Sequence, residues 1–102
     1  MKAIPALIDD YLRHLSIERG LAKNTISSYR RDLRNYSEFL ERNGITEPSQ
    51  ISEETIKKYL EQIGSSGILI ANSVARMLAS VRGLHRFWLF ESITQGDSSA
   101  RV

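Results

Sequence analysis

The chain contains no cysteine and no long apolar run, and each absence excludes classes of protein. Without cysteine there is no disulfide framework, no thiolate metal site and no thiol nucleophile. No apolar run is longer than that of residues 68–71, which is far shorter than a membrane-spanning helix requires. Residues 1–7 lack the charged, apolar and small-residue succession of a secretory signal. These absences favour a cytoplasmic protein with no membrane partner.

The usual catalytic and metal-binding patterns are missing as well. The two histidines, His14 and His85, have no second histidine or carboxylate at ligand spacing on the same helix face. His85 falls within an apolar stripe, which is typical of a core histidine. There is no glycine-rich phosphate loop, Ser-His-Asp set or zinc motif, and the four tyrosines lie at helical core spacing. We therefore expect no catalytic residue, no cofactor and no metal in this chain.

The formal net charge is only +2, but the charge is unevenly distributed. Residues 19–46 carry six lysines and arginines against three acids, and residues 71–91 carry three against one. Residues 47–70, between these segments, carry two against four. A clustered basic surface matters more for nucleic-acid binding than the total charge. The two basic segments are therefore the candidates for such a surface.

Hydrophobic periodicity predicts four helices and no strand. Apolar residues recur at spacings of three and four within the approximate ranges 5–18, 24–42, 53–63 and 72–91. The connections are short, and the clearest break is the run of small residues 64–67. Four amphipathic helices with short connections indicate an all-α fold, a compact four-helix bundle. We assign residues 1–94 to this domain and residues 95–102, which show no periodicity, to the start of an interdomain linker or a frayed end.

The predicted helix over residues 24–42 has two distinct stripes. Its apolar stripe consists of Ile26, Tyr29, Leu33, Tyr36 and Leu40. A second stripe, about 110° away, carries Lys23, Ser27, Arg30 and Arg34. Asn24 or a close neighbour is expected to cap the helix, whose N-terminus favours anions. One face is thus suited to burial and the adjacent one to nucleic-acid phosphates, with a merely solvated charged face as the alternative.

The predicted helix over residues 72–91 has a polar face that burial does not explain. Arg82 and Arg86 lie away from the stripe that contains Trp88, and Gly83 is found among them. A glycine inside a helix costs up to about 1 kcal/mol relative to alanine, so a close neighbour should require it. That neighbour is either a DNA molecule, which the arginines would also contact, or another helix of the bundle.

Three segments of the chain resemble a known family. Residues 19–26, RGLAKNTI, followed by Tyr29, Asp32 and Leu33, resemble the signature of the N-terminal core-binding domain of tyrosine recombinases. Residues 73–87 resemble the fourth helix of that domain, and residues 99–102 resemble the entry into its interdomain linker. The likeness covers nearly the whole chain. It is greatest to the bacterial Xer-type recombinases, and more to the XerD branch than to the XerC branch.

The resemblance implies a SAM-like domain that forms one half of a clamp around double-stranded DNA. It also implies that the catalytic domain lies outside this chain, so that this fragment binds DNA without cleaving it. The role would be strand exchange at a short recombination site, such as chromosome dimer resolution, with a related recombinase on the same site. The isolated domain is expected to be a monomer in a nucleoid-associated protein.

The resemblance also assigns site residues by position. Those residues are Lys23, Asn24, Thr25, Arg30, Arg76, Arg82 and Arg86. Together with Ser27 and Arg34 of the basic stripe, they make up the predicted DNA-binding set.

Two other interpretations are open. The core-binding domain of a phage or mobile-element integrase has similar motifs, although an arm-binding domain often precedes it, and here Met1 leads directly into the first helix. A helical protein-interaction module would direct the arginines to acidic partner surfaces and expose Trp88 and Phe87 as anchors. A stand-alone enzyme is not supported, because no catalytic set is present.

Overall fold

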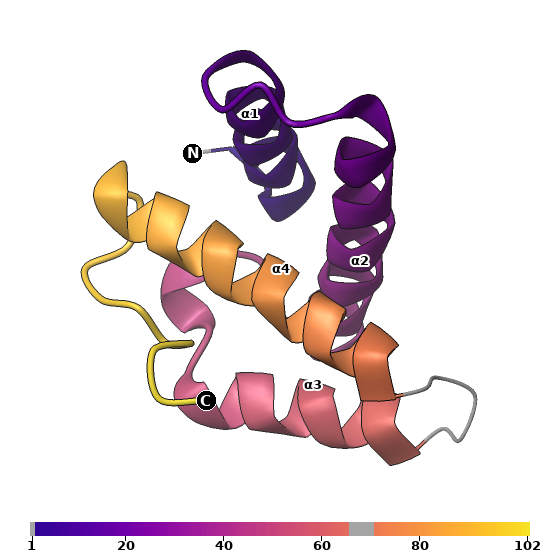
Figure 1. The fold of residues 1–102 in the computed structure, drawn as a ribbon. Helices are drawn as coiled ribbons and strands as arrows, with labels where there is room; N and C mark the ends of the chain where they lie inside the picture. Colours follow the sequence, from indigo (N-terminus) through magenta and orange to yellow (C-terminus); the bar gives the residue numbers. More distant parts are fainter. Residues whose placement is uncertain (1, 66–70) are drawn as a thin grey trace.

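Figure 1 shows the computed structural model, which describes residues 2–65 and 71–102. The elements in order are α1 (Ile4–Ile17), α2 (Lys23–Arg42), the short 3-10 helix η1 (Pro48–Gln50), α3 (Glu53–Ser65) and α4 (Ala71–Phe90). The described residues contain no strand, and none of their helices is long and apolar enough to cross a membrane. The prediction of an all-α, four-helix fold is confirmed.

Helix α4 is central to the fold, since it contacts each of the other three α-helices. It runs diagonally across Figure 1, with α1 above it and α3 below it in that view. Helices α1 and α2 also contact each other, so the N-terminal half of the chain packs against α4 as a pair. This arrangement lets the apolar stripe of α4 contribute to the core along most of its length.

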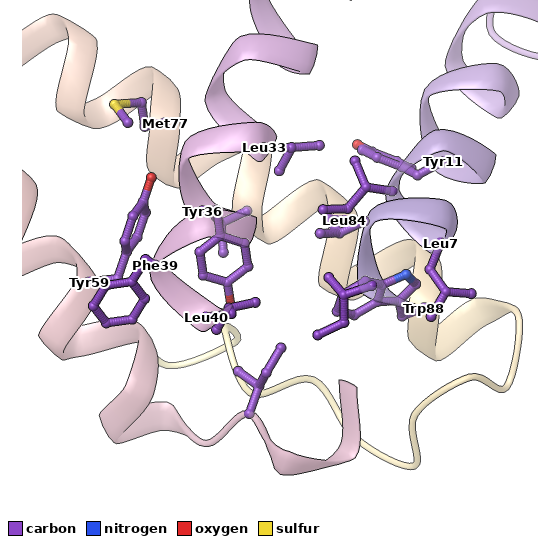
Figure 2. Packing of buried hydrophobic residues seen from close by; sticks show 14 of the residues in the cluster. Leu7, Tyr11, Leu33, Tyr36, Phe39, Leu40, Tyr59, Met77, Leu84 and Trp88 are labelled. Atoms are coloured by element: carbon purple, nitrogen blue, oxygen red, sulfur yellow. The ribbon is translucent and has the colours of Figure 1, made fainter. Parts of the chain in front are cut away.

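The core forms where the predicted apolar stripes meet, as Figure 2 shows for Leu33, Tyr36, Leu84 and Trp88. All four of these side chains are 0% exposed. Burying a leucine side chain, for example, contributes about 1.5–3 kcal/mol to folding. The Trp88 indole N–H has no hydrogen-bond partner within the described part of the chain, so packing alone holds this ring.

The start of α2 differs from the prediction. The helix begins at Lys23, one residue before Asn24, and its N-cap Ala22 makes no side-chain hydrogen bond. Before it, Gly20 has a φ of 61°, in the left-handed region that favours glycine. The predicted side-chain cap is therefore wrong. Asn24 lies inside the first turn and not before it, where a capping side chain has to be.

The predicted break at residues 64–67 is wrong in its first half. Helix α3 continues through Gly64 and Ser65. The Ser65 hydroxyl donates to the carbonyl oxygen of Gln62 at 3.3 Å and so satisfies one acceptor of the last turn. The other half of the predicted break, Ser66 and Gly67, lies outside the described residues.

Residues 95–102 pack against the bundle. The Ser98 hydroxyl donates to the carbonyl oxygen of Ile51 at 2.8 Å, and Ser99 is 0% exposed. The Asp97 carboxylate accepts a hydrogen bond from the main-chain N–H of Ser99 at 2.9 Å and fixes the turn. The expectation of a frayed end is wrong, because these bonds order residues that have no hydrophobic periodicity. The assignment of 95–102 to an interdomain linker stays a prediction.

The contact between α1 and α4 requires glycine at position 83. A Cβ atom on Gly83 would overlap the hydroxyl oxygen of Tyr11, whose side chain is buried. Of the two explanations offered by the sequence, a neighbouring helix is the one observed. The small residue serves packing inside the bundle.

Gly83→Ala is expected to lower the free energy of unfolding by about 1–2 kcal/mol. Overpacking costs about 1–3 kcal/mol, and the better helix propensity of alanine offsets up to about 1 kcal/mol of this. Tyr11→Phe removes the overlapping hydroxyl and leaves Cζ of the ring at 3.4 Å from the new Cβ. The double variant should therefore regain the lost stability in urea unfolding. Equal losses for Gly83→Ala and for the double variant would contradict the contact.

His85 is a core histidine, as predicted. Its side chain is 1% exposed, and its Nε2 lies 2.8 Å from the hydroxyl of Tyr36. Burial lowers the pKa of His85 to about 4, because desolvation disfavours the charged imidazolium. Burial also raises the pKa of the Tyr36 phenol. Both rings are therefore neutral at pH 7, and the hydrogen bond between them satisfies two buried polar groups.

The stability of the domain should fall as the pH drops from about 6.5 to about 4. The unfolded chain protonates His85 near its ordinary pKa of about 6.5, whereas the folded chain resists protonation down to pH about 4. Within this window the unfolded state binds more protons, so the free energy of unfolding decreases by about 1.4 kcal/mol per pH unit.

Urea unfolding at pH 7.5 and 5.0 tests this effect, with His85→Gln as the comparison. The wild-type chain should lose about 2 kcal/mol more than the variant between the two pH values. An equal loss in both chains would show that His85 does not cause the pH dependence.

Candidate functional site

An ion pair between the buried Asp32 and the partly exposed Arg76 joins α2 to α4. The Asp32 carboxylate, only 3% exposed, accepts hydrogen bonds from Arg76 Nη2 at 2.8 Å and from Arg76 Nε at 3.0 Å. The Ser80 hydroxyl donates to the same carboxylate at 3.0 Å. The hydrogen bonds and the charge of Asp32 raise the pKa of the Arg76 guanidinium. Charge-assisted bidentate bonds fix geometry strongly. We call Asp32, Arg76 and Ser80 the seam.

On α2 the seam separates the core from one solvent-facing side. Successive residues of an α-helix are about 100° apart, so Leu33 and Leu40 lie about 80–100° from Asp32 in one direction. Both leucines are buried. Asn24 and Arg31 lie about as far from Asp32 in the opposite direction, and both are exposed.

Helix α4 has the same arrangement about Arg76. The buried Met77 and Leu84 lie about 80–100° to one side of it, and the exposed Ala79 and Arg86 about 60–80° to the other. Because the two helices share one core, their outer sides lie on one face of the molecule. We call this the seam face. Its residues are Asn24, Ser28, Arg31, Asn72, Ala75, Arg76, Ala79 and Arg86.

The basic stripe predicted on α2 lies elsewhere. Lys23, Arg30 and Arg34 are about 160–180° from the seam and therefore face away from α4. Arg30 Nη1 lies 3.4 Å from Oδ1 of Asp9 on α1, in an exposed ion pair. Arg30 and Arg34 line a groove between α1 and α2, together with Asp9 and Glu38. These carboxylates reduce the attraction of the groove for phosphate.

The other predicted site residues are divided between these surfaces and the tail. Thr25 lies about 20° from Asp32 along α2, whereas Ser27 lies about 140° away, on the side of the basic stripe. Arg82 donates to the main-chain oxygen of Val102 and is therefore directed toward the tail. The predicted residues that the seam brings to one side of α2 and α4 are Asn24, Thr25, Arg76 and Arg86.

Comparison with known families identifies the chain. Residues 8–91 match the family described as phage integrase, N-terminal SAM-like domain. The chain belongs to this family. The matched range contains the whole seam and nearly all of the four helices.

Three relatives of this integrase-family domain are named tyrosine recombinase XerD. The protein from Mycobacterium tuberculosis strain H37Rv is 43% identical over 108 residues, covering 100% of this chain and 35% of the relative. The Mycobacterium leprae protein is 40% identical, covering 98% and 34%. The Bifidobacterium longum protein is 38% identical, covering 94% and 31%. The resemblance to Xer-type recombinases is confirmed, and the chain spans about a third of the length of these relatives.

The interaction-module interpretation required exposed aromatic anchors in this integrase-family domain. Trp88 is 0% exposed. Phe87 is half-buried, with its ring centroid 5.2 Å from that of Tyr11 and 4.8 Å from that of His14. Both aromatic rings pack within the bundle, so the prediction of exposed anchors is wrong.

Sequence reasoning missed the seam of this integrase-family domain, although one signal for it is present. Asp32 lies three residues after Tyr29 and four before Tyr36, within the apolar stripe of α2. A carboxylate at such a position requires a cationic partner. The partner Arg76 lies 44 residues away, and no local pattern connects the two. Arg31, which lies on the seam face, is outside the basic stripe and was not among the predicted residues.

Proposed function

We propose that this domain binds double-stranded DNA through the seam face, as the N-terminal part of a Xer-type tyrosine recombinase. The seam is the observation that carries the proposal. Because Asp32 and Arg76 join α2 to α4, the outer sides of the two helices lie on one solvent-exposed face. The names of the relatives support the proposal, since a recombinase has to hold DNA.

The seam face has the chemistry that a DNA backbone requires. Arg31, Arg76 and Arg86 offer cationic donors to phosphate oxygens. Within residues 2–65 and 71–102, Arg31 and Arg86 form no ion pair, so their charge is available. Ala75 and Ala79 are small and exposed, which allows α4 to approach a nucleic-acid backbone closely.

The start of α2 adds an anion-binding element to the same side. No side chain caps this end, so the first N–H groups of α2 are free to bind a phosphate. Asn24 and Thr25 lie in this first turn and supply an amide and a hydroxyl beside those N–H groups. Side chain and main chain can thus contact one phosphate together.

The rest of the predicted set stays a prediction. The basic stripe of α2 faces away from the seam, so it would contact DNA only if the DNA backbone also passed along that side of the helix. Its predicted residues are Lys23, Ser27, Arg30 and Arg34. Arg82 would contact DNA only after releasing the oxygen of Val102.

For the whole protein we propose the breaking and rejoining of DNA at a short recombination site, in chromosome dimer resolution. The cleaving residues would lie in the part of the relatives that this chain does not span. The proposal includes a related recombinase that binds the same site. It also places the protein in the cytoplasm, on the nucleoid, and takes the isolated domain to be a monomer. A mobile-element integrase is the second candidate, because the family description includes phage integrases.

Fluorescence anisotropy with a labelled mixed-sequence duplex, repeated across salt concentrations, tests the proposal. Arg30→Ala and Arg31→Ala form a matched pair, since both residues are exposed on α2 but lie on different sides of it. The logarithm of the wild-type binding constant should fall linearly with the logarithm of salt concentration. Arg31→Ala should reduce this slope by about one, while Arg30→Ala should change it less.

Two outcomes would contradict the proposal. A wild-type chain that does not bind the duplex even at low salt would exclude DNA binding by this domain. A larger loss for Arg30→Ala than for Arg31→Ala would place the contact on the α1–α2 side and exclude the seam face.

A further inference from the structure

We propose that Asp32 is a positioning residue, which holds the Arg76 guanidinium in the orientation that meets a DNA phosphate. The proposal rests on the proposed function. It assigns a part in DNA binding to a side chain that is only 3% exposed and that DNA cannot reach.

The ion pair divides the Arg76 guanidinium into a held edge and a free edge. Nε and Nη2 donate to the two carboxylate oxygens of Asp32, at 3.0 and 2.8 Å. Nη1 forms no hydrogen bond within the described part of the chain. The Arg76 side chain is still 44% exposed. An arginine held along one edge and open along the other can bridge a carboxylate and a phosphate.

Ser80 holds the carboxylate from a second direction. Its side chain is 0% exposed, and its hydroxyl donates to Oδ2 of Asp32 at 3.0 Å. The same hydroxyl lies 3.2 Å from the carbonyl oxygen of Arg76. Ser80 and Arg76 are both on α4. The Asp32 carboxylate, although it extends from α2, is therefore held against α4 by both residues.

Asp32 has two opposing effects on the binding of DNA by Arg76. A free surface arginine loses rotamer freedom when it binds a phosphate, whereas Arg76 has already lost it. The carboxylate also repels the phosphate. It lies behind the guanidinium, however, and Coulomb repulsion weakens with distance. We expect positioning to dominate, so that removing the negative charge of Asp32 weakens binding.

The sign of the effect separates positioning from simple neutralisation. Asp32→Asn keeps the side-chain shape and adds one unit of positive net charge. Glu61→Gln makes the same change of charge at an exposed position on α3 and is the matched control. In anisotropy measurements on the labelled mixed-sequence duplex, Asp32→Asn should weaken binding about tenfold. Glu61→Gln should bind like the wild type or slightly more tightly.

Two single variants keep the test decisive if Asp32→Asn does not fold, and a double variant tests whether Asp32 acts through Arg76. Arg76→Lys preserves the charge but loses the planar fork that matches the carboxylate, so it should also weaken binding about tenfold. Ser80→Ala leaves both charges and should weaken binding about twofold. Asp32→Asn/Arg76→Lys should bind no more weakly than Arg76→Lys alone, because Asp32 acts through Arg76.

A nuclear magnetic resonance readout tests the positioning without DNA. The Arg76 Nε–Hε signal should exchange slowly with water in the wild-type chain, because the Asp32 carboxylate covers this proton. In Asp32→Asn and in Ser80→Ala the exchange should be faster. If the Arg76 Nε–Hε proton of the wild-type chain exchanged as fast as those of the exposed Arg31 and Arg86, the proposal of a held edge would be contradicted.

The outcomes separate this proposal from the proposed function. If the wild-type chain binds the duplex and Asp32→Asn binds as tightly or more tightly, the positioning role is overturned and DNA binding stands. Losses that multiply in the double variant also overturn the positioning role. If the wild-type chain does not bind DNA at all, the proposed function fails and the positioning role fails with it.

Discussion

Trp88→Ala is expected to lower the free energy of unfolding by about 3–5 kcal/mol, because the removed indole leaves a cavity that its neighbours fill only in part. Trp88 is the largest fully buried side chain, and Figure 2 shows it surrounded by core residues such as Leu7 and Leu84. Small domains have a total stability of about 5–15 kcal/mol, so this variant should be close to unfolding. Urea unfolding followed by far-UV circular dichroism measures the loss.

Phe90→Ala is the matched control for this prediction. Phe90 is also aromatic and lies on α4, but it is 81% exposed, so its truncation should change stability by less than about 0.5 kcal/mol. Trp88→Phe should cost less than Trp88→Ala, because it keeps most of the ring and removes an indole N–H that has no partner. A Trp88→Ala chain with the stability of the wild type would show that this ring is not the anchor of the core.

Arg76→Ala is expected to cost roughly 3 kcal/mol, the second largest loss. It leaves the Asp32 carboxylate buried without a cation, and breaking a buried pair in this way costs about 3–5 kcal/mol. The low end applies because Arg76 is 44% exposed and water can partly replace it. Asp32→Ala/Arg76→Ala should lose less than the sum of the two single variants, since it leaves no unpaired charge.

Arg86→Ala is the control, because it removes an exposed arginine from the same helix without breaking an ion pair within the described residues. It should change the free energy of unfolding by less than about 0.5 kcal/mol. Equal stability of Arg76→Ala and Arg86→Ala in urea would show that the seam does not join the two helices energetically.

The helices and most of the core follow from local patterns in the sequence. Amphipathic repeats predict which residues of a helix are buried, and Leu33, Tyr36, Leu40 and Trp88 are all buried as expected. His85 follows the same rule, since its place in an apolar stripe outweighs its polar character. Such features depend on neighbours within one helix and are therefore readable from the chain alone.

The contacts that orient the helices depend on residues far apart in the chain. Ser98 and Ile51 are 47 residues apart, and neither lies in a pattern that indicates the other. Gly83 is required by Tyr11, on a helix at the other end of the chain. Periodicity gives the buried side of each helix but not which neighbour it meets there.

The candidate site illustrates the same limit. The basic residues of α2 lie on two sides of the helix. More of them lie on the side of Arg30 and Arg34, so a count of charges alone favours that side as the DNA-binding one. Which side shares a surface with α4 is decided by the pair of Asp32 and Arg76. That pair turns Arg31 toward the side of Arg86 and leaves Arg30 beside Asp9. The functional hypothesis follows from the sequence, but the face proposed for it follows from packing.

Titration of the ¹⁵N-labelled chain with a mixed-sequence DNA duplex at low salt tests most directly whether the seam face holds DNA. We predict that the amide signals that shift belong to residues 24–31 of α2 and 72–86 of α4, together with the Arg76 Nε–Hε signal. The signals of α3 and of Phe90 should stay unchanged. Shifts confined to α1 and the groove beside Arg30 and Arg34, or no shift at all, would contradict DNA binding through the seam face.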